Sequence, residues 1–184
     1  MVKRVTVQTL LKMKQQSEKI SVLTAYDYSF AQQIDSAGVD VILVGDSLGM
    51  VVQGRESTIP VTVDDMVYHT KLVGRGAERA LLLADMPFMS YATVAQALES
   101  AGRMMKEGGA TMVKLEGGAA QLEVVDALVN SNIPVCAHLG LQPQAVHRLG
   151  GYRVQGRESS VAQQMVEDAV ALQSAGASML VLEC

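Results

Sequence analysis

Ionisable side chains follow several strand-like apolar runs of this sequence, at the points where the runs end. Near the ends of five successive runs stand Asp46 with Ser47, Asp85, Lys114 with Glu116, His138, and Glu183. Taken singly, each has an ordinary structural explanation, such as an aspartate that caps a turn or a lysine that pairs with a nearby glutamate. Burying several carboxylates close together is unfavourable unless a cation neutralises them, so their conjunction favours a cation site.

The carboxylates of this set predict which cation would bind. Asp46, Asp85 and Glu116 supply oxygen ligands only, which Mg²⁺ prefers, and Mn²⁺ is the alternative. Zinc is disfavoured because no cluster of cysteine and histidine residues accompanies them. We therefore expect one Mg²⁺ per chain, with water or substrate in its remaining coordination positions.

A 2-oxo acid is the substrate class that suits such a site beside Lys114, because its carboxylate and keto oxygens can chelate the ion together. Chelation withdraws electron density from the carbonyl and stabilises the enolate that forms when a neighbouring C–H loses its proton. Glu183 is the first candidate for the general base, since partial burial at the end of an apolar strand raises the proton affinity of a carboxylate. His138 is the rival base, and it could equally be a hydrogen-bonding wall residue.

These groups can converge only if the runs that carry them are neighbouring parallel strands, because the loops after parallel strands share one face of the fold. Short β-rich runs alternate with amphipathic stretches, which is typical of βα units around a parallel sheet. Helices are expected at 28–38, 93–109 and 160–176, and each ends in a glycine suited to terminate a helix. The expected strands span residues 20–27, 39–46, 80–87, 111–118, 133–140 and 178–184.

Two architectures accommodate these units: an open doubly wound sheet, and a (β/α)8 TIM barrel of which the chain contains a part. The expected strands are nearly continuous in apolar residues, as in strands covered on both faces. The sequence stops at MLVLEC, inside an expected strand with no helix after it. We therefore expect one incomplete barrel domain over residues 1–184 that holds the first six strands. A further helix expected at 6–16 would cover the bottom of the barrel.

Composition excludes several classes of partner. With 184 residues, 49% of them hydrophobic, the chain is long enough for one sizeable core. A formal net charge of -4 and scattered Lys and Arg give no basic stripe for nucleic acid. No apolar run approaches the roughly 20 residues of a membrane span, so we expect a cytoplasmic protein without a membrane partner. Cys136 and Cys184 lie in apolar runs and are expected to be buried free thiols.

Eight motifs spread over nearly the whole chain carry a family resemblance. They are TAYDYSFA, LVGDSLGM, VQGRESTIPVT, LLLADMPFMSYAT, MVKLEGG, VCAHLGLQPQ, GGYRVQGR and LVLEC. On these motifs the sequence resembles the ketopantoate hydroxymethyltransferase (3-methyl-2-oxobutanoate hydroxymethyltransferase) family. The resemblance implies a TIM barrel of the phosphoenolpyruvate/pyruvate type that assembles as a homo-oligomer, a decamer in the family. Family members continue beyond the position of Cys184, which implies that the last βα units of the barrel are missing here.

The activity that the resemblance implies is transfer of a hydroxymethyl group from 5,10-methylenetetrahydrofolate to 3-methyl-2-oxobutanoate, which gives 2-dehydropantoate in pantothenate biosynthesis. The loops 51–60 and 141–158 lie near enough to the strand ends to contribute to folate binding. Two alternatives stay open. One is another Mg²⁺-dependent 2-oxo acid lyase or aldolase of the same barrel group, and the other is a non-catalytic truncated product.

The resemblance also implies roles for individual residues, matched position by position. The family's metal-associated carboxylates match Asp46, Asp85 and Glu116. Its contacts to the oxo acid match Asp46, Ser47, Asp85 and Lys114. Glu183 matches the proton acceptor. These roles agree with those expected from the strand ends.

Overall fold

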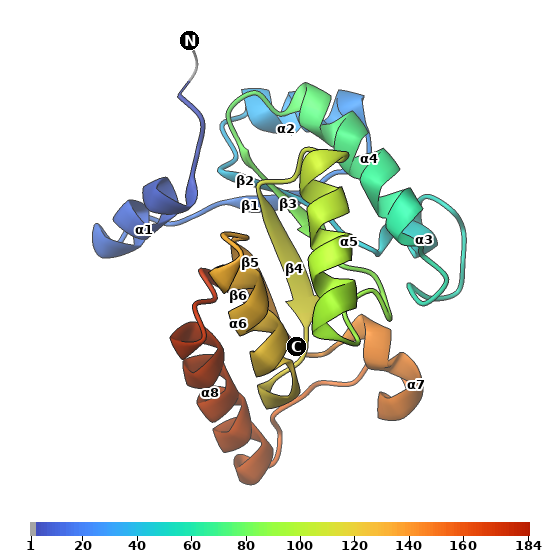
Figure 1. The fold of residues 1–184 in the computed structure, drawn as a ribbon, viewed down its shortest axis with the longest axis vertical. Coiled ribbons are helices and arrows are strands. Elements are labelled where there is room, and N and C mark those ends of the chain that lie inside the picture. Colours follow the sequence, from blue (N-terminus) through green and yellow to red (C-terminus); the bar gives the residue numbers. More distant parts are fainter. Residues whose placement is uncertain (1–2) are drawn as a thin grey trace.

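Six strands form one parallel sheet, and they lie in it in the order in which they follow one another along the chain. The computed structural model describes residues 3–184. The strands are β1 (Val22–Thr24), β2 (Val41–Val44), β3 (Leu81–Asp85), β4 (Met112–Glu116), β5 (Val135–Gly140) and β6 (Met179–Glu183). Every expected strand is confirmed. The sequential order and the curled sheet (Figure 1) are those of a partial TIM barrel, whereas a doubly wound sheet changes direction at a switch point.

Helices connect consecutive strands. They are α2 (Tyr28–Ser36), α3 (Leu48–Val51), α4 (Val63–Gly76), α5 (Val94–Lys106), α6 (Leu122–Asn130), α7 (Val146–Leu149) and α8 (Ser159–Ser174), with short 3-10 turns η1 (Ala119–Gln121) and η2 (Pro143–Ala145). Gly38, Gly109 and Gly176 follow α2, α5 and α8 with φ of 84°, 81° and 99°, so the three expected helix stops are confirmed. Within residues 3–184, no helix is both long and apolar enough to cross a membrane.

The two faces of the sheet carry separate hydrophobic cores. On the outer face, sheet residues such as Ile42 and Val113 pack with buried residues of the connecting helices. On the inner face, Leu83 and Cys136 share a smaller cluster with Leu10, which comes from the N-terminal helix α1 (Val7–Gln15). Because both faces of the central strands are covered, their long apolar runs are accounted for.

Helix α1 stands apart from the connecting helices, on the other side of the sheet (Figure 1). Thr6 caps this helix. Its side chain accepts a hydrogen bond from the Thr9 main-chain N–H, and the Thr9 side chain accepts one from the Thr6 main-chain N–H. Just before the helix, the Val5 main-chain N–H donates to the Arg79 carbonyl at 2.8 Å, immediately ahead of β3. Helix α1 therefore covers the N-terminal ends of the strands, which confirms the helix expected at the bottom of the barrel.

The first and last strands each pair on one side only within residues 3–184. Leu23 of β1 and Leu182 of β6 are 51% and 66% exposed, whereas β3 and β4 are buried throughout. The expectation of full coverage is thus wrong for β1 and β6, because these strands lack a neighbour on one side. Cys136, near the start of β5, is a buried free thiol as expected. Cys184 follows β6 and is exposed, so its expected burial is wrong.

Candidate active site

The C-terminal ends of β2 to β5 bring the ionisable residues together at one rim. Asp85 pairs in register with Lys114, and Glu116 pairs with His138. Asp46 follows β2 after one glycine, and its main-chain N–H donates to Asp85 Oδ2 at 3.3 Å. All five residues are at most 5% exposed. The strand-end prediction therefore identified a buried cluster of three carboxyl groups, one lysine and one histidine.

Lys114 is the one basic ammonium group of this cluster. Its Nζ lies 2.5 Å from Asp85 Oδ1 and 3.1 Å from His138 Nδ1. Burial alone would lower the pKa of Lys114, but the charges of Asp85 and Glu116 outweigh it, so the pKa is raised and the ammonium stays charged. The structural alternative in which Lys114 pairs directly with Glu116 is not what the structure shows, because Asp85 is the carboxylate that lies against the ammonium.

The remaining carboxyl groups have no such partner and hold protons near neutral pH. Burial raises the pKa of Asp46 to about 7, and the charge of Asp85 adds to the shift. Burial also raises the pKa of Glu116 to about 8, where Lys114 counteracts the shift and Asp85 and Asp46 reinforce it. When all three carboxyl groups are ionised, their negative charge exceeds the single positive charge of Lys114, so the rim carries a net negative charge.

The stability of the metal-free chain is expected to fall as the pH rises from about 6.5 to 8. Folded Asp46 and Glu116 keep protons up to pKa values of about 7 and about 8, whereas the unfolded chain has released them. The folded state therefore binds more protons in this interval, and the free energy of unfolding should drop by about 2 kcal/mol. Urea unfolding in EDTA, followed by circular dichroism at a series of pH values, measures the slope.

The control for this slope is a chain with Asp46→Asn and Glu116→Gln, which lacks both of these titrating groups and should show a clearly shallower profile. His138, whose pKa is lowered to about 3 by burial and by the charge of Lys114, contributes the opposite slope only below about pH 6.5. A parent chain that becomes more stable between these pH values would contradict the raised pKa values.

The protonation state of His138 follows from its neighbours. Because an ammonium group can only donate, His138 Nδ1 must accept the hydrogen bond from Lys114, and the neutral ring then carries its proton on Nε2. That Nε2 is buried, has no hydrogen-bond partner among the described residues, and lies 3.4 Å from Glu183 Oε2. In this arrangement His138 offers no free lone pair to accept a substrate proton.

Glu183 lies at the end of β6, and its side chain is 42% exposed. The main chain fixes its place, since the Leu141 N–H donates to the Glu183 carbonyl at 2.7 Å. Gly140, with φ of 88°, permits this approach, because a Cβ there would stand 2.0 Å from the same carbonyl oxygen. Glu183 is therefore held at the edge of the rim, next to His138 and accessible to a substrate.

The alternative role of Asp46 and Ser47 as helix caps is not what the structure shows. Helix α3 begins after Ser47, but the Ser47 side chain makes no capping hydrogen bond and instead contacts the Tyr26 hydroxyl at 2.8 Å. The Asp46 carboxylate accepts a hydrogen bond from Gln144 at 2.8 Å. Both side chains are directed into contacts across the rim.

Two residues of the cluster were missed by sequence reasoning. Gln144, in η2, donates its side-chain N–H to Asp46 and its main-chain N–H to Glu116 Oε2 at 3.1 Å. The Tyr91 hydroxyl donates to the Gln144 side-chain oxygen at 2.5 Å. Within residues 3–184, no three His, Cys, Asp or Glu side chains are already arranged to hold a metal ion. The signal available in the sequence was the position of Gln144 in a loop directly after a strand.

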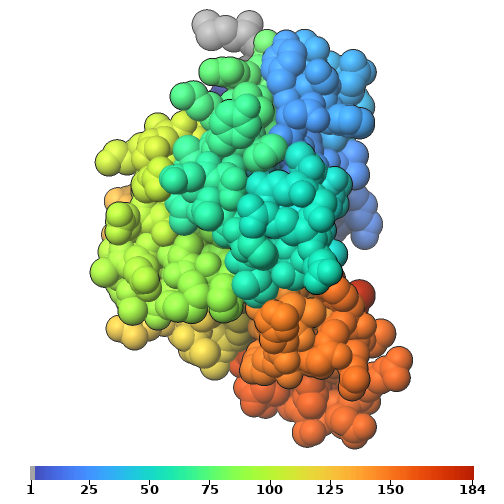
Figure 2. Space-filling model, turned by 90° about the vertical axis from the view of Figure 1, so that its right-hand side faces the viewer, coloured from blue at the N-terminus to red at the C-terminus, as the bar shows by residue number. Residues whose placement is uncertain are grey.

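A pocket of about 410 Å³ opens beside Glu116. Both loops considered for folate binding line it, through Ile59 from one side and Gln144 and Arg148 from the other. Figure 2 shows these two segments side by side, cyan against orange, and the Tyr152 hydroxyl lies 3.4 Å from Met50 Sδ where they meet. The pocket thus adjoins the carboxyl cluster and has room for a second small molecule.

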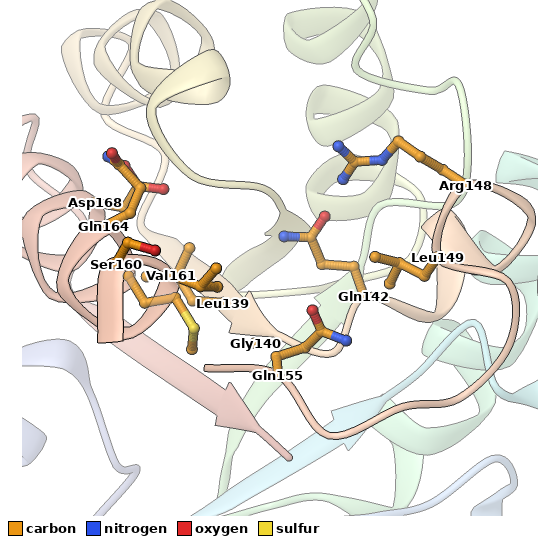
Figure 3. Close-up of a pocket in the computed structure, with 11 residues that line it drawn as sticks. Leu139, Gly140, Gln142, Arg148, Leu149, Gln155, Ser160, Val161, Gln164 and Asp168 are labelled. Atoms are coloured by element: carbon orange, nitrogen blue, oxygen red, sulfur yellow. The ribbon is translucent and has the colours of Figure 1, made fainter. Parts of the chain in front are cut away.

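A second pocket, of about 320 Å³, lies between the end of β5 and the first half of α8 (Figure 3). Gln142 and Arg148 border it on one side, and Gln164 and Asp168 on the other. None of the residues expected at the active site lines it. Glu116 therefore adjoins the first pocket, and no other residue expected at the active site lines either of the two.

Comparison with known sequences extends over almost the whole chain. The family model described as ketopantoate hydroxymethyltransferase matches residues 4–184. A 3-methyl-2-oxobutanoate hydroxymethyltransferase of Nitrosococcus oceani is 62% identical over 181 residues, which are 98% of this chain and 69% of that protein. Its counterpart in Alkalilimnicola ehrlichii is 63% identical over 98% of this chain and 65% of its own length. The chain thus spans about two thirds of the length of these relatives.

Comparison with solved structures supports the fold. A 2,3-dimethylmalate lyase of the PEP mutase/isocitrate lyase superfamily matches with a TM-score of 0.69 at 17% identity, over 100% of this chain and 63% of that one. Phosphonopyruvate hydrolase, solved with oxalate and Mg²⁺, matches with a TM-score of 0.73 at 12% identity, over 96% of this chain and 62% of that one. At these low sequence identities the matches show only that the fold is shared. On the sequence matches, the chain belongs to the ketopantoate hydroxymethyltransferase family.

Proposed function

We propose that this chain transfers a hydroxymethyl group from 5,10-methylenetetrahydrofolate to 3-methyl-2-oxobutanoate, which forms 2-dehydropantoate for pantothenate biosynthesis. The observation that carries the proposal is the buried rim of three carboxyls and one lysine in a chain that is 62% identical to an enzyme of that name. The homo-oligomer that the family resemblance implies, a decamer in the family, and the cytoplasmic location expected from the sequence belong to the same proposal.

The donor chemistry of the rim fits Mg²⁺, with Mn²⁺ as the alternative. Asp46, Asp85 and Glu116 offer oxygen atoms only, and burial together with the charges of neighbouring carboxyl groups raises the pKa of Asp46 and Glu116 in spite of Lys114. A divalent cation would relieve this repulsion by keeping the carboxyls ionised. These residues would hold the ion, and when bound it would draw electron density from the keto group of the oxo acid.

Lys114 and Ser47 are the residues that would orient the oxo acid. The Lys114 ammonium, charged and 4% exposed, can donate a hydrogen bond to an oxygen that gains negative charge in the reaction. Its contacts with Asp85 and His138 hold it in one position, which limits the reorganisation needed during the reaction. Ser47, whose hydroxyl lies 2.8 Å from that of Tyr26, would contact the oxo acid.

Glu183 would remove the proton from C3 of the oxo acid. It is the carboxylate at the rim with substantial exposure, so a substrate can approach it, and the Nε2–H of His138 faces it at 3.4 Å. His138 would then act as a wall residue that orients Glu183. The carbon that loses the proton would attack the one-carbon unit of the folate, which the pocket beside Glu116 would hold. A water molecule would supply the hydroxyl of the new hydroxymethyl group, and tetrahydrofolate would leave.

The direct test uses the 184-residue chain with Mg²⁺, 3-methyl-2-oxobutanoate and 5,10-methylenetetrahydrofolate, with 2-dehydropantoate measured by mass spectrometry. Product that requires all three components supports the proposal. Consumption of the oxo acid without folate would instead favour a lyase or aldolase. Absence of binding heat for the oxo acid in the presence of Mg²⁺ would favour a non-catalytic product.

Asp46→Ala is expected to weaken Mg²⁺-dependent binding of 3-methyl-2-oxobutanoate by at least about tenfold, because one oxygen ligand and one counter-charge are lost. Isothermal titration calorimetry with and without Mg²⁺ measures the effect. Asp126→Ala, an exposed aspartate on α6, serves as the matched control and should bind like the parent. Unchanged affinity in Asp46→Ala would remove Asp46 from the metal site.

A further inference from the structure

Gln144 occupies an unusual place for an amide side chain, inside a cluster of carboxyl groups. It belongs to η2, in the segment between β5 and α8, and is 7% exposed. Its Nε2 donates to Asp46 Oδ2 at 2.8 Å and to the Met86 carbonyl at 2.9 Å. Its main-chain N–H donates to Glu116 Oε2, and its side-chain oxygen accepts from Tyr91. Apart from its main-chain carbonyl, every polar group of Gln144 thus makes a hydrogen bond within the rim.

These contacts compete with a cation for the same oxygen atoms. An N–H donor carries partial positive charge and approaches a carboxylate along its lone pairs, as a metal ion does. Mg²⁺ needs its oxygen ligands at about 2.0–2.1 Å in an octahedral arrangement, which leaves no room for a hydrogen-bond donor at the same position. An ion that uses the lone pairs of Asp46 Oδ2 and Glu116 Oε2 that Gln144 now occupies would have to displace its N–H groups.

We propose that Gln144 is a displaceable placeholder for the divalent cation: its N–H groups bind Asp46 and Glu116 in the metal-free chain and leave them when the ion enters. The inference rests on the metal site of the proposed function. It makes Gln144 a positioning residue that couples metal binding to the segment 141–158. Gln144 and Arg148 line the pocket beside Glu116, which is proposed to hold the folate. Release of Gln144 therefore changes the shape of this pocket.

The test is the affinity of the metal-free chain for Mn²⁺, measured by calorimetry and by the electron paramagnetic resonance signal of free Mn²⁺. Gln144→Ala removes the side-chain contact that must break, so Mn²⁺ should bind about tenfold more tightly than to the parent. Gln142→Ala, in the same segment but without a contact to the carboxyls, is the matched control and should bind like the parent. Equal or weaker binding to Gln144→Ala would overturn the inference, because Gln144 would then be a supporting residue that stays in place.

A second measurement uses the unmutated chain and so does not depend on the folding of a variant. The main-chain N–H of Gln144 is protected by Glu116 in the metal-free state, and saturation with Mn²⁺ should accelerate hydrogen exchange in the peptides that cover residues 142–146. Unchanged or slower exchange there would overturn the inference. If neither the parent nor Gln144→Ala binds Mn²⁺, the metal site itself is wrong. If the parent binds Mn²⁺ and the variant gains nothing, only the role of Gln144 is wrong.

Discussion

Glu183→Gln is expected to slow exchange of the C3 proton of 3-methyl-2-oxobutanoate by about 10²–10⁴-fold, the usual contribution of a general base. Glutamine has nearly the same shape, so the side chain keeps its place next to His138, but its amide does not accept a proton near neutral pH. Binding of the oxo acid should stay close to that of the parent, since Glu183 is not among the proposed ligands. Loss of the C3 proton signal in D₂O, followed by NMR in the presence of Mg²⁺, measures the exchange rate.

Two further variants separate Glu183 from its neighbour His138. Glu99→Gln, an exposed glutamate on α5, should exchange the proton at the parent rate. His138→Gln should reduce the rate less than Glu183→Gln, because a wall residue only orients the base. If Glu183→Gln exchanges the proton at the full rate while His138→Gln does not, His138 is the base.

The fold was largely predictable because its elements are set by local sequence pattern. Runs such as 80–87 are too continuously apolar for an exposed strand, and the glycines at 38, 109 and 176 mark the helix ends. Exposure of the outer strands could not be predicted in the same way. Leu23 and Leu182 lie in runs as apolar as those of β3, and their exposure depends on the pairing partners that the sheet provides.

The site was predictable to the extent that strand ends determine it. Parallel register places Asp85 beside Lys114 and Glu116 beside His138 once the strands are identified. The sequence indicated Gln144 only as one polar residue in a loop after a strand, because its burial depends on the path of the segment 141–158 back across the rim. The pairing of Lys114 with Asp85 in preference to Glu116 also had to come from the structure, since both carboxyls are equally plausible from the sequence.

Lys114→Met is expected to lower the free energy of unfolding of the metal-free chain by about 3–5 kcal/mol at pH 8, the usual effect of removing one partner of a buried ion pair. Methionine keeps much of the apolar stem, so the loss reports mainly on the charge. Asp85 would be left buried without its ammonium at 2.5 Å, next to two further carboxyls. Urea unfolding in EDTA measures the loss, and Lys71→Met on the exposed face of α4 is the matched control, expected to change stability by less than about 0.5 kcal/mol.

The dependence of this loss on pH and on Mn²⁺ distinguishes a counter-charge from a packing role. At pH 6 the carboxyl groups can take up protons, because their pKa values are raised further once the ammonium is gone, so the loss should be smaller than at pH 8. Mn²⁺ should restore part of the stability, since it supplies the missing positive charge to the same oxygens. A loss that is equal at both pH values and insensitive to Mn²⁺ would mean that the Lys114 stem, and not its charge, stabilises the rim. In that case the excess negative charge from which the Mg²⁺ site was inferred would not exist.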